Sequence, residues 1–418
     1  MKVLRLGMVL AFGAMALPTW AAEPAPDAIL KTYADIALAS YEDALTSAKA
    51  LDAAVDALIA DPTDATLNAA RDAWRAARPW YQQTEAFRFG NPIVDDWEGR
   101  VNSWPLDEGL IDYVDASYGS ESDENGLYTA NAIANPKISI DGTEVDASKL
   151  TPEFLSGALQ EAGGVEANVA TGYHAIEFML WGQDLHGTGP GAGERPATDY
   201  STTACTHGNC DRRAEYLKSA TDLLVSDLTD MVGNWTAAGA ARAALKTSGL
   251  AAILTGMGSL SYGEVAGERM KLGLILHDPE EEHDCFSDNT YISHLNDAIG
   301  VQNVYLGKYT RLDGSVVSGP SLSELVAARD PKLDTELKGL LDATVAKMNL
   351  MKVRGDTVEK YDQMIAEGNV EGNAVVQSAI DGLVAQTRGV ERVVALLKLD
   401  DVTVEGSDSL DNPDAVFQ

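Results

Sequence analysis

One segment of the chain pairs an imidazole with a carboxylate at a spacing that suits metal binding. Residues 172–177 have the sequence GYHAIE, and apolar residues around them recur at helical spacing. Residues three apart share a face of a helix, so the side chains of His174 and Glu177 can bind one metal ion. Gly172 would allow another backbone or a ligand to approach closely. The same spacing also suits a buried histidine that is hydrogen-bonded to its own glutamate.

A polar stripe lies on an earlier predicted helix. Its members are three or four residues apart and therefore share a face: Arg78, Tyr81, Glu85 and Arg88. Interleaved aromatic residues are typical of a half-buried polar seam. An ion-pair ladder in solvent is the alternative, and the sequence alone does not decide between them.

Acidic residues form two further candidate sites. Glu264 and Glu268 are four apart on a predicted helix, where like charges destabilise unless a cation lies between them. Arg269 is expected to point away from this face, and an exposed acidic face is the alternative. Residues 278–290 combine His283 with many oxygen ligands but lack the spacing of a helix–loop–helix calcium site. There, Asp288 and its neighbours are also suited to capping the next helix.

Long helices must position these side chains. Apolar periodicity predicts helices over 29–58, from about 64 to Gly90, and through most of residues 165–400. An Asp-Gly turn at 141–142 predicts one small β-hairpin at 138–146. We therefore expect an all-α protein of two helical-bundle domains, each similar to a four-helix bundle. The expected domains are residues 23–200, with the hairpin and a loop insertion, and 201–400; a frayed acidic tail, 401–418, follows.

The N-terminus and the charge indicate where the protein acts. Lys2 and Arg5 precede an apolar run at 6–17 and a small-residue exit, which predicts a signal peptide over 1–22. We expect a periplasmic protein, with possible association to the outer membrane. Cys205 and Cys210 are then able to pair, leaving Cys285 free. The 64 acidic against 31 basic residues give a formal charge of −33, which argues against nucleic-acid binding and favours cations.

Five segments together resemble the imelysin family, also called the iron-regulated protein A or insulin-cleaving membrane protease family. They are residues 84–90, 103–107, 172–184, 267–270 and 282–290. The resemblance implies a two-domain helical fold and an exported protein of iron acquisition. It places the family's G-x-H-x-x-E metal motif on Gly172, His174 and Glu177. A histidine often follows the Ser-Asp-Asn-Thr segment in this family, whereas this chain has Tyr291.

These observations predict a site and three functions. The expected metal ligands are His174, Glu177, Glu85 and Glu268, and the expected cleft residues are Arg88, Trp104, Arg269, His283 and Asp288. The first function is iron binding, with zinc as a substitute; the cargo is an iron ion, a chelate or haem. An outer-membrane or periplasmic uptake component is the expected partner. Metal affinity should fall below pH ~6.5, where a free imidazole becomes protonated.

Two other functions remain as alternatives. A zinc metallopeptidase needs about three ligands and a general base. His174 and Glu177 supply only two ligands, and no base lies near them in sequence. Familiar protease and nucleotide motifs are also missing. An interaction protein that passes cargo to a partner is the third function.

Overall fold

Helices make up nearly all regular structure in the computed structural model, which describes residues 23–417. The predicted signal peptide, 1–22, lies outside the described residues. The α-helices are α1 (Pro26–Ala60), α2 (Asp64–Gln82), α3 (Pro92–Glu98), α4 (Pro152–Phe154), α5 (Gly172–Trp181), α6 (Cys210–Trp235), α7 (Ala240–Ser259), α8 (Leu272–Leu276), α9 (Thr290–Leu306), α10 (Leu322–Arg329), α11 (Pro331–Thr357), α12 (Tyr361–Ile365), α13 (Val370–Leu397) and α14 (Asp408–Asp411). The all-α expectation is confirmed.

Shorter turns and two π-helical segments interrupt the α-helices. The π-helices are η4 (Leu155–Leu159) and η7 (Leu260–Lys271). Of the 3₁₀ turns, η1 (Glu85–Phe87) and η8 (Pro279–Glu281) lie near the site described below. The helix predicted to run to Gly90 therefore ends earlier, at Gln82, and Glu85 belongs to a separate turn.

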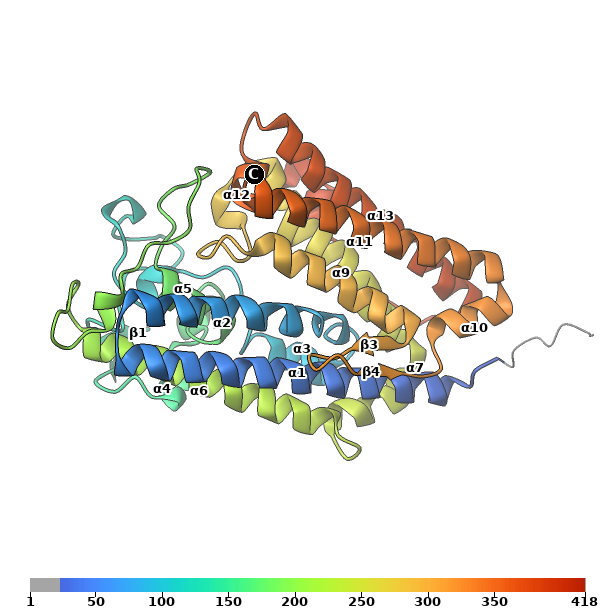
Figure 1. Ribbon diagram of the computed structural model, residues 1–418, viewed down its shortest axis with the longest axis horizontal. Helices are drawn as coiled ribbons and strands as arrows, with labels where there is room; N and C mark the ends of the chain where they lie inside the picture. Colours follow the sequence, from blue (N-terminus) through green and yellow to red (C-terminus); the bar gives the residue numbers. More distant parts are fainter. Residues whose placement is uncertain (1–22, 418) are drawn as a thin grey trace, which may run out of the picture.

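The long helices form two packing groups (Figure 1). In the first, α1 packs against α2 and α6, and α5 lies against α6 and α2. In the second, α11 packs against α13 and α9, and α13 also packs on η7. Contacts between α2 and α9 join the groups. The predicted boundary at 200–201 does not separate them, because α6 packs in the first group. Apolar periodicity shows which face of a helix is buried but not which helix covers it.

Two small hairpins decorate the helices. The predicted one is confirmed: β1 (Lys137–Ile140) pairs antiparallel with β2 (Thr143–Asp146). Asp141 and Gly142 both have positive φ, 51° and 77°, as a type I′ turn requires. A second hairpin was not expected and joins β3 (Lys308–Thr310) to β4 (Val316–Ser318).

The C-terminal segment packs against η7. The backbone N–H of Glu405 donates to the Ser259 hydroxyl at 3.1 Å, and the Ser409 hydroxyl donates to the Gly267 carbonyl at 3.0 Å. A Cβ at Gly263 would lie only 2.8 Å from the Glu405 carbonyl oxygen, so glycine permits this approach. The expectation of a frayed tail from residue 401 is therefore wrong for the described part, because these contacts hold it on the π-helix.

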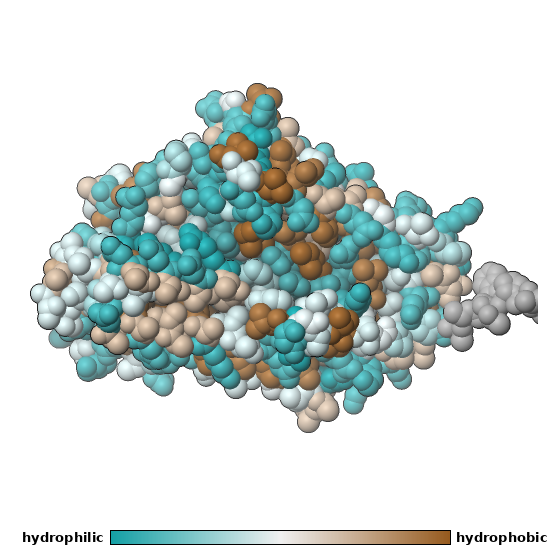
Figure 2. Space-filling model, viewed as in Figure 1, coloured by the Kyte–Doolittle hydropathy of each residue, from teal (hydrophilic) through white to brown (hydrophobic). Residues whose placement is uncertain are grey.

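Three further features concern the surface and the cysteines. Across residues 23–417, no helix combines the length and the apolar character needed to cross a membrane. Hydrophobic residues on the face in Figure 2 are concentrated over the C-terminal helix group. Cys205 and Cys210 form a disulfide, and Cys285 is free and buried.

Candidate metal site

Helix α5 carries His174 and Glu177 in the interior, since every residue of this helix is buried. It begins at Gly172, whose φ is +80°. A Cβ on Gly172 would lie 2.4 Å from the Val101 carbonyl oxygen. That carbonyl accepts a hydrogen bond from the Tyr173 backbone N–H at 2.8 Å. Glycine at the start of the motif thus lets the 101–104 segment lie directly against α5.

Replacing Gly172 with alanine is expected to destabilise the fold by about 1–3 kcal/mol, the usual cost of a non-glycine residue in such backbone. The clash with Val101 adds to this cost. Urea unfolding of both proteins measures the difference. Gly339→Ala is the control, because Gly339 lies within α11 with open space around it and alanine is the better helix former. Equal stability of Gly172→Ala and wild type would show that the close approach is unimportant.

Both carboxylate oxygens of Glu177 are already engaged. Oε2 lies 3.1 Å from His174 Nδ1. Oε1 accepts hydrogen bonds from the backbone N–H of Ser287 at 3.0 Å and from its hydroxyl at 2.6 Å. This arrangement differs from the prediction that His174 and Glu177 share one ion. It fixes the imidazole ring so that Nε2 is the nitrogen left for a ligand.

A second imidazole lies beside the first. The rings of His174 and His283 have centroids 4.6 Å apart, and the Trp104 ring is 5.3 Å from His174. Among the described residues, neither His174 Nε2 nor either nitrogen of His283 has a hydrogen-bond partner, although all three atoms are buried. One donor atom from each of His174, His283 and Asp284 lies within 4.8 Å of the others. These three residues form the His centre.

A buried arginine holds the third member of the His centre. Arg78 Nη2 donates to Asp284 Oδ1 at 2.6 Å, and both side chains are completely buried. Asn289 Nδ2 donates to the other oxygen at 2.9 Å. Arg78 also donates to the Asn102 side chain at 2.6 Å. Asp284 is therefore fixed as a carboxylate beside the two imidazoles.

Burial sets the protonation states of the His centre. It lowers the pKa of His174 and of His283 well below 6.5, and the charge of Arg269 disfavours the imidazolium form of both. The charge and hydrogen bonds of Arg78 outweigh burial and lower the pKa of Asp284 to about 2. Burial raises the pKa of Glu177 well above its usual value. The centre therefore offers two neutral imidazoles and one charged carboxylate near neutral pH.

An acidic cleft reaches the His centre from outside. It has a volume of about 520 Å³, and its lining includes Trp104 and the buried His283. Arg88 and Arg269, two of the predicted cleft residues, also line it, and so does Glu268, which was predicted as a metal ligand. Eight acidic residues but only these two arginines are in the lining: Asp95, Asp96, Glu98, Glu161, Glu166, Glu264, Glu268 and Glu281.

The cleft arginines bind Glu85, which was a predicted ligand, and Glu264. Arg269 Nη2 lies 3.1 Å from Glu85 and 2.6 Å from Glu264, and Arg88 Nη1 lies 3.6 Å from Glu264. The expectation that Arg269 points away from Glu264 is wrong. In a π-helix hydrogen bonds join residues five apart, which brings 264 and 269 together. Glu268 is exposed in the cleft. Within residues 23–417, the donor set at the His centre includes neither Glu85 nor Glu268.

Two residues singled out from the sequence lie away from the His centre. Asp288 belongs to a separate group of carboxylates with Glu282 and Asp362. The Tyr291 hydroxyl donates to Asp356 at 3.2 Å and accepts from Lys360 at 2.8 Å. The residue in the family's histidine position therefore faces α11 and the start of α12.

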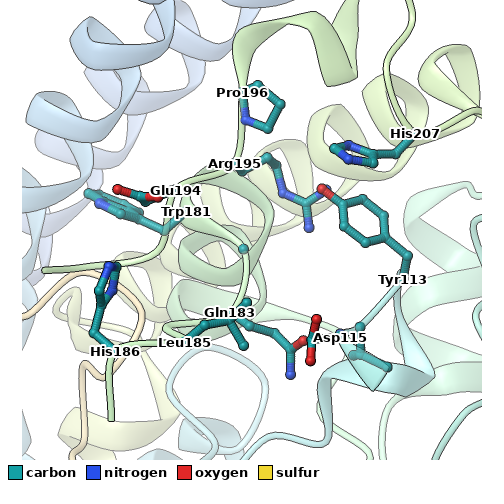
Figure 3. A pocket seen from close by; sticks show the side chains of 12 residues that line it. Tyr113, Asp115, Trp181, Gln183, Leu185, His186, Glu194, Arg195, Pro196 and His207 are labelled. Carbon is teal, nitrogen blue, oxygen red and sulfur yellow. The ribbon is translucent and has the colours of Figure 1, made fainter. Parts of the chain in front are cut away.

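A second cavity, of about 400 Å³, lies at the C-terminal end of α5 (Figure 3). Trp181, His186 and Tyr113 line it, and the Arg195 guanidinium lies 4.9 Å from the Tyr113 ring centre. Asp112 binds Arg195 at 2.6 Å. In the described chain, the groups of three donor atoms close enough to share an ion lie elsewhere. The His centre is therefore the better metal site.

The model of the imelysin family, described as peptidase M75, matches residues 37–390. The chain belongs to the imelysin family. The matched range contains the His centre and the acidic cleft.

Known proteins similar to this imelysin include one curated relative and two solved structures. Iron-regulated protein A of Synechococcus elongatus is 27% identical over 303 residues, which cover 72% of this chain and 69% of the relative. A crystal structure from Parabacteroides distasonis, assigned as an iron-regulated protein A precursor, aligns with a TM-score of 0.63 and 22% identity over 90% of this chain and 96% of that one. The crystal structure of an imelysin-like protein from Psychrobacter arcticum aligns with a TM-score of 0.58 and 16% identity. The alignment covers 92% of this chain and 98% of that one. The two structures support the fold.

The sequence did not reveal the roles of several residues in the imelysin site. Arg78 was placed on the polar stripe, but its pairing with Asp284 joins residues 206 apart in the chain. Ser287, which binds Glu177, gave no signal beyond its place in the acidic segment. Helical spacing placed Arg78 on the polar stripe without deciding whether that stripe is buried, and Asp284 lies in the acidic segment. Only the fold brings the two together.

Proposed function

We propose that this imelysin binds ferrous iron at His174, His283 and Asp284 and serves iron acquisition. One observation carries the proposal: a buried set of two imidazoles and one carboxylate, with imidazole nitrogens that lack partners in the described structure. Two histidines and one carboxylate are the donor set of many non-haem Fe²⁺ sites. Zinc has compatible ligand preferences and is the expected substitute.

The pairing of the rings favours an ion over haem as cargo. When two imidazoles bind opposite faces of a haem iron, the distance between their ring centroids is the sum of two metal–nitrogen bonds of about 2.0 Å each and the radii of both rings. That distance exceeds the 4.6 Å between the centroids of His174 and His283. The rings are instead close enough to bind one ion as neighbouring ligands.

The acidic cleft supports entry of a cation. Its lining carries eight carboxylates, two arginines and His283 of the His centre. A cleft of one charge concentrates ions of the opposite charge and speeds their association. The whole chain, with its formal charge of −33, adds to this attraction. We further propose export to the periplasm, on the strength of the predicted signal peptide, and transfer of iron to an uptake component there.

The metallopeptidase alternative is weaker on the same geometry. A hydrolytic site needs a base that takes a proton from the metal-bound water. Glu177 is engaged by His174 and Ser287, and Glu85 is paired with Arg269. Glu268 lies in the cleft, outside the donor set of the His centre.

Iron affinity is expected to rise about tenfold per pH unit for as long as Glu177 stays protonated in the metal-free protein, a range that extends well above pH 4.5. The raised pKa of Glu177 means that the metal-free protein keeps a proton on the Glu177–His174 pair. Metal at His174 Nε2 needs Nδ1–H and a Glu177 carboxylate, so binding releases one proton and is favoured by high pH. Anaerobic calorimetry in buffers of different ionisation enthalpy measures this release.

Glu177→Gln is the matched variant for this experiment. It keeps a hydrogen-bonding group beside His174 but carries no titratable proton, so proton release and the pH slope should both fall towards zero. Identical pH profiles for the variant and wild type, with a midpoint near 6.5, would instead assign the dependence to a free imidazole and contradict the proposed role of Glu177.

A further inference from the structure

Three carboxylates outside the His centre meet in the interior. Glu282 and Asp288 come from the loop before α9, and Asp362 is the second residue of α12. All three are buried, with at most 6% of each residue exposed. One oxygen from each lies within 4.8 Å of the others. These residues form the carboxylate triad.

The triad lacks the partners that buried carboxylates require. In the part of the chain that the structure describes, both oxygens of Asp362 are buried without a hydrogen-bond partner, as are Glu282 Oε1 and Asp288 Oδ1. Lys360 is near in sequence, but its ammonium donates to the Tyr291 hydroxyl at 2.8 Å. No ion pair within residues 23–417 involves any of the three. A buried carboxylate is stable only when it is paired, protonated or bound to a metal.

We propose that the carboxylate triad binds a hard divalent cation of the Ca²⁺ class. Its donors are all oxygen, which such ions prefer and which distinguishes it from the imidazole donors of the His centre. Two oxygens that bind one Ca²⁺ at 2.3–2.6 Å are at most about 5 Å apart. The oxygens of the triad meet this limit. Asp362 is buried, and one of its oxygens lies within 4.8 Å of an oxygen of each of the other two carboxylates.

The position of the triad gives its cation a structural role. Glu282 directly precedes His283 and Asp284, and Asp288 directly follows Ser287, which binds Glu177. An ion that links Glu282 and Asp288 to Asp362 therefore fixes both ends of this loop on α12. This structural role rests on the proposed function, because it means that Ca²⁺ at the triad orders the residues proposed to bind iron.

Calcium titration of the EDTA-treated mature protein tests the proposal. We expect one Ca²⁺ per chain and a rise in Tm on binding. Asp362→Asn should weaken this affinity by about 100-fold or more, since even residues that only support a metal ligand contribute 10–100-fold. Glu367→Gln is the control, because it removes an exposed carboxylate just beyond α12 and should bind as wild type does. Asp288→Asn should weaken Ca²⁺ affinity to the same extent. It serves as the test variant if Asp362→Asn does not fold.

The outcomes separate this site from the iron site. Because Asp362 is repelled by the charge of Asp288, Asp362→Asn relieves like-charge repulsion and should match or exceed the Tm of calcium-free wild type. His174→Ala should bind Ca²⁺ unchanged, so failure at the His centre leaves this proposal standing. No binding of Ca²⁺, Mg²⁺ or Mn²⁺ by wild type would overturn it. The proposal would also be overturned if the Asp362→Asn and Asp288→Asn proteins bound Ca²⁺ with the same affinity as wild type.

Discussion

Replacing His174 or His283 with alanine is expected to weaken Fe²⁺ binding by about 100-fold or more, equivalent to about 2.7 kcal/mol. Each substitution removes one of the two nitrogen ligands of the His centre, whose donor atoms lie within 4.8 Å of one another. His294, whose ring centroid lies 6.1 Å from that of His283, is outside the donor set of the His centre and would have to move to replace either ligand. Anaerobic titration calorimetry with Fe²⁺ gives the affinities directly.

His186→Ala is the matched control for these variants. His186 lines the second cavity, and its Nδ1 lies 2.8 Å from Asp184, outside the His centre. Its removal should leave Fe²⁺ affinity unchanged. Circular dichroism shows whether each variant is folded. Folded His174→Ala and His283→Ala proteins that bind iron as tightly as wild type would eliminate the proposed site.

Arg78→Leu is expected to lower the free energy of unfolding by about 3–5 kcal/mol in iron-free protein. The substitution leaves the Asp284 carboxylate buried without its main counter-charge, 2.6 Å away in the wild type. It also removes the donor to Asn102. Urea unfolding at pH 7 with a chelator present measures the loss.

Arg75→Leu tests whether this loss reflects the buried pair. Arg75 lies one turn earlier on α2, partly exposed, with its guanidinium over the Trp181 ring at 4.8 Å. Arg75→Leu removes this ring contact and a 3.4 Å hydrogen bond to the Ser287 carbonyl oxygen, so it should cost about 1–2 kcal/mol, less than the loss of the buried pair. If Arg78→Leu were no more costly than Arg75→Leu, Asp284 would not depend on Arg78 for its charge.

The sequence predicted the local elements of the site well. Helical spacing placed His174 and Glu177 on one helix, and α5 spans Gly172–Trp181. The Asp141-Gly142 turn placed the first hairpin. These predictions succeeded because residues close in the chain determine such elements. Likewise, the glycine at the start of α5 was correctly expected to allow close approach of another backbone.

Contacts across long sequence separations were beyond the same reasoning. Helical spacing placed Arg78 on the polar stripe, but it showed neither that this stripe is buried nor that Asp284 meets Arg78 there. For the same reason, the sequence could not show that the carboxylate of Glu177 is occupied by Ser287, which changes its expected role from metal ligand to orienting His174.

The π-helix was the other obstacle. Residues 260–271 have an ordinary helical pattern, which placed Glu264 and Glu268 together and Arg269 elsewhere. The wider turn of η7 instead joins Glu264 to Arg269 at 2.8 Å. Nothing in the local composition distinguishes a π-helical segment from an α-helical one.

Anomalous diffraction at the iron edge, from crystals grown anaerobically with Fe²⁺, tests the central claim most directly. We expect one iron peak within about 2.5 Å of His174 Nε2, a nitrogen of His283 and a carboxylate oxygen of Asp284, close to the usual lengths of metal–ligand bonds. An iron peak among the exposed carboxylates of the cleft, with both imidazoles unligated, would contradict it.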